Sequence, residues 1–322
     1  MHSSLPYKTK QFFFVLIKLS IVVGAFYFIY QKLLHNDHLD FRSFILILKQ
    51  NKLFDIKNVV FLVLLSSLNW FLEITKWRFL VSKLKTITLL KATEQSLGAL
   101  TASLLTPNRI GEYGAKAIYY SKPLRKRVLL LNLMSNLMQM SITVILGIIG
   151  FIFYYNTFDI TINIIKISRG LLIALTILVL TLFGIKQSKY KIKGFSIPKI
   201  TNYLTTLGYP YITIGLLISL IRYTIFSFQF YYILTLLGIE TSYPDAMVII
   251  TTMYLLASII PTISIFDVVI KGSIAIYLFG LANIAELPVL VCTLLMWLLN
   301  FALPSLLGSY FVLRFNPSKT II

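Results

Sequence analysis

Hydrophobic residues in this chain are gathered in long runs separated by short polar segments. Six runs reach the roughly 20 residues that a helix needs to cross about 30 Å of hydrocarbon at 1.5 Å per residue. The fold class that this pattern predicts is an all-α integral membrane protein with about six full transmembrane helices. The predicted spans are 11–34, 58–81, 127–155, 162–185, 207–237 and 287–315.

Two further segments, 86–121 and 243–281, are apolar but do not follow the pattern of ordinary spans. In each, an apolar stretch meets a proline, Pro107 or Pro261, and a second stretch carrying charge follows. Two full crossings would need about 40 apolar residues plus a turn, and proline breaks a helix. Each segment is therefore predicted to form a re-entrant helical hairpin. Its break must be buried or line a cavity, because irregular backbone is not tolerated against lipid.

Residues 38–57 have apolar side chains at helical spacing beside charged ones, which favours an amphipathic helix lying in the membrane interface. Three regions follow from these assignments. Residues 1–57 hold the first transmembrane helix and the interfacial helix, and 58–315 form the main membrane domain. Residues 316–322 form a cytoplasmic tail.

Composition supports a membrane protein. The chain is 57% hydrophobic and only 13% charged, whereas soluble domains carry about 25% charged residues. The net charge of +19 would favour nucleic acid in a soluble protein, but here the cations lie in short loops between spans. Such loops remain on the cytoplasmic side of the bilayer. We therefore expect no nucleic-acid partner and a protein of the cytoplasmic (inner) membrane with both termini in the cytoplasm.

The two hairpin segments share a spacing of charged residues. An acid, Glu112 or Asp267, follows the proline by five or six residues, and a lysine, Lys116 or Lys271, comes four residues later. Three complete predicted spans separate the hairpins, and because three is odd the hairpins should open from opposite sides. The pattern predicts an inverted-topology repeat with halves at about 58–155 and 207–315. Many secondary transporters have this architecture, with the substrate site at the repeat interface.

The charged residues of the hairpins are candidates for binding a lipid headgroup, because ionisable groups at membrane depth cost about 2.5–3.5 kcal/mol each on insertion scales. Arg109 is the strongest candidate phosphate ligand, since its planar fork can bind two oxygens at the start of a helix. The simpler alternative is that each acid and the lysine one turn later only neutralise each other. The full candidate set is Arg109, Glu112, Lys116, Asp267 and Lys271.

Other polar residues within apolar runs are candidates for lining the same cavity. They are Asn108, Glu73, Arg78, Arg222 and Asn136. Glu73 and Arg222 could equally form buried structural pairs. Asn136 belongs to a stripe with Asn132 and Gln139, and such a stripe either holds helices together or faces a cavity.

No enzymatic motif is present: the sequence lacks a nucleotide-binding glycine loop, a zinc-protease motif and a nucleophile elbow. His35 and His38 flank an aspartate in a loop, which is too few ligands for a metal site. We expect a protein that is not an enzyme and that uses no metal or cofactor.

The segment 106–116, Thr-Pro-Asn-Arg-Ile-Gly-Glu-Tyr-Gly-Ala-Lys, resembles the flippase-like family named for the transmembrane region of lysylphosphatidylglycerol synthase. Pro107, Arg109, Gly111 and Glu112 match the motif of that family's first half. In the second half Pro261 and Asp267 match, but Thr-Ile-Ser-Ile-Phe replaces the family's glycine-rich turn. The resemblance covers roughly 58–315 and implies a lipid flippase domain without the soluble synthase domain.

The function expected from these features is a flippase or related transporter for an anionic phospholipid or a polyprenyl-phosphate-linked lipid. Its partners would be membrane lipids, with a homo-oligomer or an envelope-synthesis enzyme as a possible protein partner. The alternative is a non-catalytic scaffold or accessory subunit of an envelope-lipid or glycan synthesis enzyme. A membrane-embedded transferase is a third reading, and no acceptor-activating residue supports it.

Overall fold

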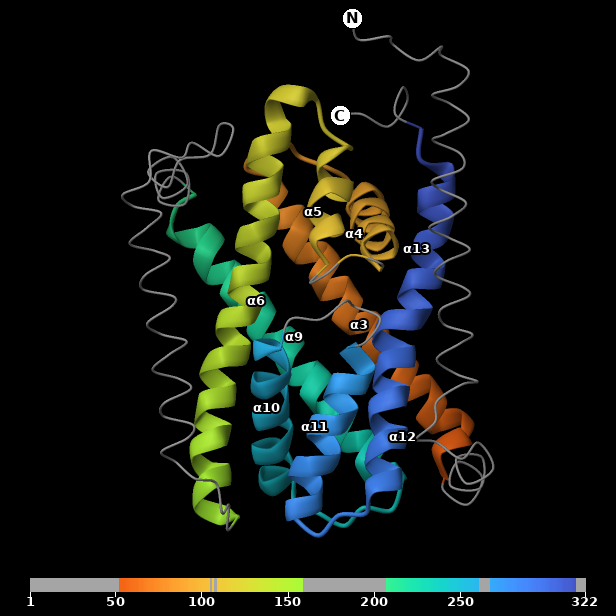
Figure 1. Cartoon of the computed structure of the whole chain (residues 1–322). Helices are drawn as coiled ribbons and strands as arrows, with labels where there is room; N and C mark the ends of the chain where they lie inside the picture. Colours follow the sequence, from red (N-terminus) through yellow and green to blue (C-terminus); the bar gives the residue numbers. More distant parts are fainter. Residues whose placement is uncertain (1–51, 105, 107–108, 159–206, 261–266, 317–322) are drawn as a thin grey trace, which may run out of the picture.

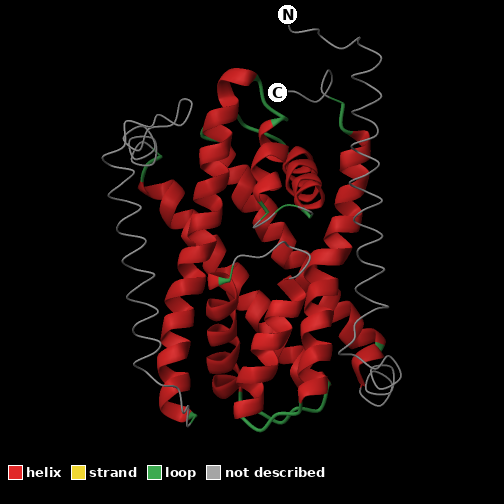
Figure 2. Ribbon diagram, in the orientation of Figure 1, coloured by secondary structure: helices red, strands yellow, loops and turns green. Residues whose placement is uncertain are grey.

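The computed structural model describes residues 52–104, 106, 109–158, 207–260 and 267–316. Within these ranges every regular element is helical and no strand occurs (Figure 2). The all-helical prediction is confirmed for this part of the chain. The predicted spans 11–34 and 162–185, most of the predicted interfacial helix at 38–57, and most of the predicted tail lie outside the described residues.

Four helical stretches are long and apolar enough to cross a membrane: α3 (Ile56–Val81), α6 (Lys122–Thr157), α9 (Tyr209–Leu236) and a C-terminal stretch (Glu286–Arg314). They correspond to four of the six predicted spans. α6 begins five residues before the predicted span because a proline at its first turn suits a helix start, where the missing N–H would have no partner.

The C-terminal stretch consists of α12 (Glu286–Trp297), a π-helical turn η2 (Leu298–Ala302) and α13 (Leu303–Arg314). Pro304 has no backbone N–H to donate to the Asn300 carbonyl one turn earlier. That carbonyl instead accepts a hydrogen bond from the Trp70 indole Nε1 at 2.9 Å. The carbonyl that the proline leaves without its usual helical partner therefore links this stretch to α3.

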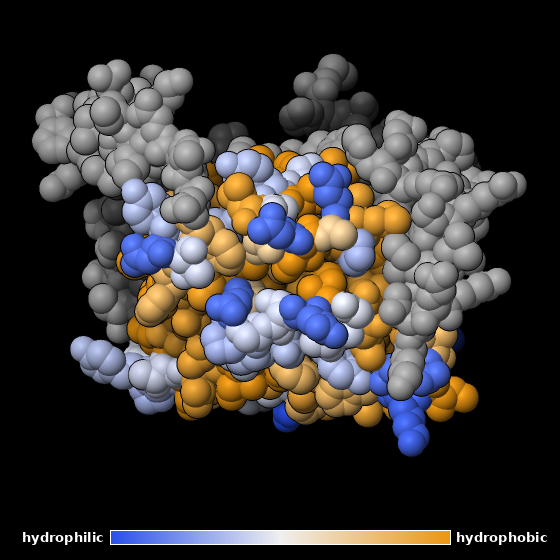
Figure 3. Space-filling view, turned by 90° about the horizontal axis from the view of Figure 1, so that it is seen from below, coloured by the Kyte–Doolittle hydropathy of each residue, from blue (hydrophilic) through white to orange (hydrophobic). Residues whose placement is uncertain are grey.

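The outer faces of the long helices are apolar. Leu64 of α3, Ile152 and Phe153 of α6 and Leu217 of α9 are each more than half exposed. A water-soluble protein rarely exposes so many large apolar side chains together, so lipid is the environment that suits these faces. Figure 3 looks onto the end of the molecule where α10 and α11 join their neighbours, and shows hydrophilic residues scattered among apolar ones.

Two shorter helix pairs lie between the long helices, as the sequence predicts. The first consists of α4 (Leu89–Ser103) and α5 (Ile110–Ala117), and the second of α10 (Tyr243–Ile259) and α11 (Asp267–Leu281). Both pairs are interrupted where the sequence places the breaks. The prolines expected to cause the breaks, Pro107 and Pro261, lie outside the described residues.

The start of α5 has a constrained backbone. Arg109 occupies the position before the helix with φ of 56°, in the left-handed region that few residues other than glycine adopt. The hydroxyl of Thr106 accepts a hydrogen bond from the Gly111 N–H at 2.9 Å. A β-carbon at Gly111 would lie 2.9 Å from the Thr106 methyl, so only glycine allows this close return of the chain.

Contacts between the helices repeat in two halves. α3, α4, α5 and α6 correspond to α9, α10, α11 and the α12–α13 stretch. In each half the two hairpin helices pack on each other and the second packs on the long helix that follows. Across the halves, α4 packs on α13 just as α10 packs on α6. In Figure 1 the corresponding helices run in opposite directions, with α4 and α5 near one end of the molecule and α10 and α11 near the other.

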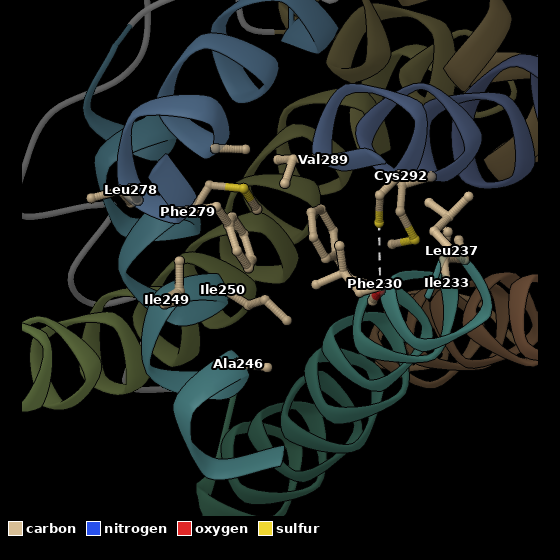
Figure 4. Close-up of a cluster of buried hydrophobic side chains, with 14 of the residues drawn as sticks. Phe230, Ile233, Leu237, Ala246, Ile249, Ile250, Leu278, Phe279, Val289 and Cys292 are labelled. Carbon is tan, nitrogen blue, oxygen red and sulfur yellow. Dashed lines mark hydrogen bonds between the residues drawn. The ribbon is translucent and has the colours of Figure 1, made fainter. Parts of the chain in front are cut away.

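The second hairpin is held by an apolar core. Phe230 of α9 stacks on Phe279 of α11 with ring centroids 6.0 Å apart, and the Cys292 thiol of α12 donates to the Phe230 carbonyl at 3.4 Å. Figure 4 shows these side chains converging with those of α10, including Ile250. The hairpin is thus packed against both flanking long helices.

Two of the contacts between the halves place a glycine against a threonine. Gly308 of α13 lies against Thr101 of α4, whose hydroxyl donates to the Ser305 carbonyl at 2.7 Å. Gly150 of α6 lies against Thr251 of α10. Small residues let helix backbones approach closely in a membrane, so the two halves can pack tightly at both of these contacts.

Gly308→Ala is expected to lower the free energy of unfolding by about 1–3 kcal/mol, the usual cost of overpacking. The added methyl would meet the Leu97 carbonyl, which is backbone and cannot turn away. The measurement is the midpoint of thermal unfolding in detergent. Gly280→Ala is the matched control, because a β-carbon there meets nothing within 4 Å. Equal midpoints for the two variants would contradict the close contact.

Candidate functional site

A cavity of about 680 Å³ lies between the two halves. Residues at the broken ends of both hairpins line it, Arg109 from the first and Ile260 and Asp267 from the second. The long helices complete the wall. Their polar contributions are Asn69, Glu73, Asn136, Gln139, Thr143, Arg222, Tyr223, Thr293 and Asn300.

One side of the cavity carries a charged triad made by α3 and α9. The Glu73 carboxylate is bound by Lys76 at 3.0 Å and by Arg222 at 2.6 Å. Helical spacing places Lys76 one turn after Glu73, on the same face of α3. The lysine side chain is 1% exposed and the arginine side chain 18% exposed. The lysine therefore pairs with the acid from the protein interior, on the side away from the cavity, while the arginine lines the cavity.

A chain of amides fixes the position of this triad. Arg222 Nε donates to Asn69 Oδ1 at 2.8 Å, and Asn69 Nδ2 donates to Asn300 Oδ1 at 2.9 Å. Asn300 Nδ2 donates in turn to Gln229 Oε1 at 2.8 Å, and Gln229 Nε2 donates to Ser66 Oγ at 2.8 Å. The chain joins α3, α9 and η2. Because each buried amide has a partner, the chain sets the arginine's orientation firmly.

The first hairpin supplies a second charged triad, which again consists of a glutamate, a lysine and an arginine. Glu112 of α5 is bound by Lys116 at 2.8 Å and by Arg109 at 3.0 Å. Lys116 is wholly buried, donates to Asn132 Oδ1 at 2.8 Å, and lies 4.4 Å from the centroid of the Trp77 ring. The side chain of Arg109 is 38% exposed. Here too a buried lysine holds the acid and an arginine faces the cavity.

The second hairpin contributes a simpler pair at the start of α11. Lys271 donates to Asp267 Oδ2 at 2.7 Å, and both side chains are about one-third exposed. The Lys271 ammonium lies 5.9 Å from the Tyr254 ring centroid of α10. This pair forms the wall of the cavity on the side of the second hairpin, and its charges cancel.

The structure brings most of the predicted site residues to one place. Those that line the cavity are Arg109, Glu112, Asp267, Lys271, Glu73, Arg222 and Asn136. Lys116, predicted to bind a headgroup, lies behind Glu112 because Trp77 and Asn132 enclose its ammonium. Arg78, predicted to line the cavity, is also not on its wall, since its Nε donates to the Ile87 carbonyl at 3.2 Å. Asn108, Pro107 and Pro261 lie outside the described residues.

The polar stripe on α6 serves both roles that the sequence left open. Asn132 is wholly buried and binds Lys116, so it joins helices. Asn136 and Gln139 line the cavity. Asn136 donates to the Tyr113 hydroxyl at 3.0 Å, and Gln139 Nε2 donates to the Ser219 carbonyl at 3.4 Å.

Lys76 is the most important residue of the site that the sequence analysis did not single out. The structure places it at zero exposure inside α3. Carbonyl and hydroxyl oxygens of Ser135 and Ser219 lie 3.4 Å from its ammonium. Its spacing of three residues from Glu73 was the available indication that the two would pair.

Among the described residues, no group of three or more histidine, cysteine, aspartate or glutamate side chains is arranged to hold a metal. His35 and His38 lie outside those residues, so the structure does not bear on that pair.

Comparison with models of protein families identifies the family of this chain. The model of the lysylphosphatidylglycerol synthase transmembrane region matches residues 15–308. The chain belongs to this family. The match extends from the first predicted span through the first half of α13 and includes both hairpins. The protein is therefore a multi-pass membrane protein of a family linked by its description to lipid metabolism. No curated protein and no solved structure matches the chain.

Proposed function

We propose that this protein is a lipid flippase or related transporter that moves an anionic lipid across the cytoplasmic membrane. The lipid is a phospholipid or a polyprenyl-phosphate-linked lipid. The observation that carries the proposal is the cavity where the broken ends of the two hairpins meet, lined by charged residues of both halves. A headgroup would cross through this cavity while its tails remain in lipid.

The charges favour an anionic headgroup. The cavity holds two arginines, and arginine binds phosphate through two parallel hydrogen bonds. Arg109 and Arg222 come from different halves of the repeat. A headgroup bound to both would bridge the halves, so movement of one half against the other would move the headgroup. Inverted repeats of this kind support alternating access in secondary transporters.

The membrane topology belongs to the same proposal. α4 has 15 residues and α10 has 17, so they are about 22 and 25 Å long and fall short of the roughly 30 Å hydrocarbon core. We therefore propose two re-entrant hairpins with six full spans in an inverted repeat. The first hairpin enters from the cytoplasm and the second from outside, and both termini are cytoplasmic.

Single cysteines introduced at Lys122 and Ala285 test this topology, because both positions are exposed just after α5 and α11, at the ends of the hairpins away from their breaks. The background is Cys292→Ala, which removes the only native thiol. Intact cells treated with a membrane-impermeant thiol reagent should label position 285, while position 122 should react only after permeabilisation. Labelling of both positions from one side would contradict the inverted repeat.

The proposal assigns no chemical reaction and no cofactor to the protein. A homo-oligomer or an envelope-synthesis enzyme remains the proposed kind of protein partner. The cavity between the halves is the reason for favouring transport over a scaffold role, since a scaffold needs no polar path between its halves.

The test is a proteoliposome assay that measures how fast labelled headgroups exchange between leaflets. The panel is phosphatidylglycerol, phosphatidic acid and a polyprenyl phosphate, with phosphatidylcholine as the zwitterionic control. We expect faster exchange of at least one anionic lipid than in protein-free vesicles, with little change for phosphatidylcholine. Folded, correctly inserted protein that moves no lipid of the panel would overturn the proposal.

A further inference from the structure

The two Lys–Glu–Arg triads differ from ordinary ion pairs because each acid has two cations. Lys76 and Arg222 share Glu73, and Lys116 and Arg109 share Glu112. In both, the lysine side chain is at most 1% exposed and lies off the cavity wall, whereas the arginine lines the cavity together with the acid. Each triad therefore carries one surplus positive charge, and the surplus lies on a group that can reach a ligand.

The surplus is not cancelled elsewhere on the wall. Among the described residues that line the cavity, the remaining charged pair is Asp267 with Lys271, which is neutral. With the two buried lysines included, five cations face three acids, so the cluster carries two net positive charges. A bound ligand that carries two negative charges would balance this surplus.

Hydrogen-bond donors are also left over. The Nε of Arg109 and the hydroxyl of Tyr254 are buried and have no hydrogen-bond partner among the described residues. Tyr254 lines the cavity and is only 7% exposed. Leaving a buried polar group without a hydrogen-bond partner is energetically unfavourable. Both groups can donate, and the ligand that satisfies them together with the positive charge is one rich in acceptor oxygens.

Phosphate chemistry separates two classes of such ligand. A phosphate monoester carries a charge of about −1.5 to −2 at pH 7 and presents three acceptor oxygens. A phosphodiester, as in phosphatidylglycerol, carries one negative charge and leaves one cation of the cluster uncompensated. We propose that the cavity is built for a phosphate dianion, a terminal phosphate monoester or a diphosphate carried on a lipid, in preference to a phosphodiester headgroup. This inference rests on the proposed lipid transport and narrows its substrate class.

The experiment compares binding of four probes to the purified protein in detergent. Phosphatidic acid and phosphatidylglycerol share their tails and differ in phosphate charge, while inorganic phosphate and diphosphate present the charge without a lipid. The readout is tryptophan fluorescence, since Trp70 and Trp297 line the cavity. We expect phosphatidic acid to bind at least tenfold more tightly than phosphatidylglycerol, and free phosphate and diphosphate to compete more weakly.

Charge variants test the reason for the preference. Arg222→Gln removes one surplus charge, so the ratio of the two lipid affinities should fall severalfold toward unity. Arg127→Gln, an exposed arginine on α6 away from the cavity wall, is the matched control and should leave the ratio unchanged. A variant that fails to fold is recognised by its thermal midpoint, and Arg109→Gln then serves as the second charge variant.

The outcomes separate this inference from the proposed function. Phosphatidylglycerol that is transported and bound as tightly as phosphatidic acid would overturn the dianion preference and leave lipid transport standing. Inorganic phosphate bound as tightly as phosphatidic acid would overturn the lipid as the carrier of the dianion. Failure of every panel lipid both to bind and to move would overturn the proposed function itself.

Discussion

Replacing Glu73 with leucine is expected to lower the free energy of unfolding by about 3–5 kcal/mol, the usual cost of leaving one member of a buried ion pair alone. Lys76 would keep only two long contacts of 3.4 Å, to Ser135 and Ser219. The cost of losing Glu73 is smaller for Arg222, since it keeps its hydrogen bond to Asn69 and lies partly open to the cavity. The measurement is thermal or denaturant unfolding in detergent.

Two comparisons isolate the cause. Glu240→Leu removes an exposed glutamate from the loop after α9 and should change stability little. The double variant Glu73→Leu with Lys76→Met should recover much of the lost stability, because well-packed apolar residues often replace a buried ion pair at no net cost. A single Glu73→Leu variant as stable as the parent would show that Lys76 does not depend on this acid.

Replacing Arg109 with glutamine is expected to reduce lipid exchange about 10- to 150-fold while leaving the protein folded. The loss corresponds to about 1.5–3 kcal/mol for hydrogen bonds to a charged group. Folding should survive because the Arg109 side chain is 38% exposed and Glu112 keeps its bond to the buried Lys116. The measurement is the proteoliposome exchange rate per folded protein.

Arg109→Lys should fall between the parent and the glutamine variant, since lysine keeps the charge but lacks the planar fork that binds two oxygens. Arg127→Gln again provides the matched control. Unchanged exchange in the Arg109→Gln variant would exclude this arginine from headgroup binding. If the protein instead acts as a scaffold, its partner's activity should be insensitive to Arg109 and to Glu112 alike.

The predicted helices agree with the described ones because the hydrophobic run is a local property. The spans predicted at 58–81, 207–237 and 287–315 each match a described helical stretch to within two residues at either end. The pairing of Asp267 with Lys271 could also be predicted from the sequence, since a spacing of four residues along a helix places two side chains on one face. Glu112 and Lys116 follow the same rule.

The sequence alone could not tell which charged residues face the cavity. Lys76 near the end of a span has the same local pattern as a loop lysine, and only packing against α6 and α9 buries it. Lys116 has the spacing of a site residue, yet Trp77 from another helix lies over it. The amide chain from Ser66 to Asn300 joins residues more than 200 positions apart along the chain, beyond the reach of any local pattern.

The membrane environment, the helical spans, the two broken segments and the acid–lysine spacing can be predicted from the sequence, because each depends on neighbours within a few turns of helix. Tertiary structure decided that Arg109 and Arg222, from opposite halves, share one cavity and that both lysines stand behind their acids. Charge compensation depends on distances across helices, and the packing of the two halves on each other sets those distances, including the close contacts at Gly308 and Gly150.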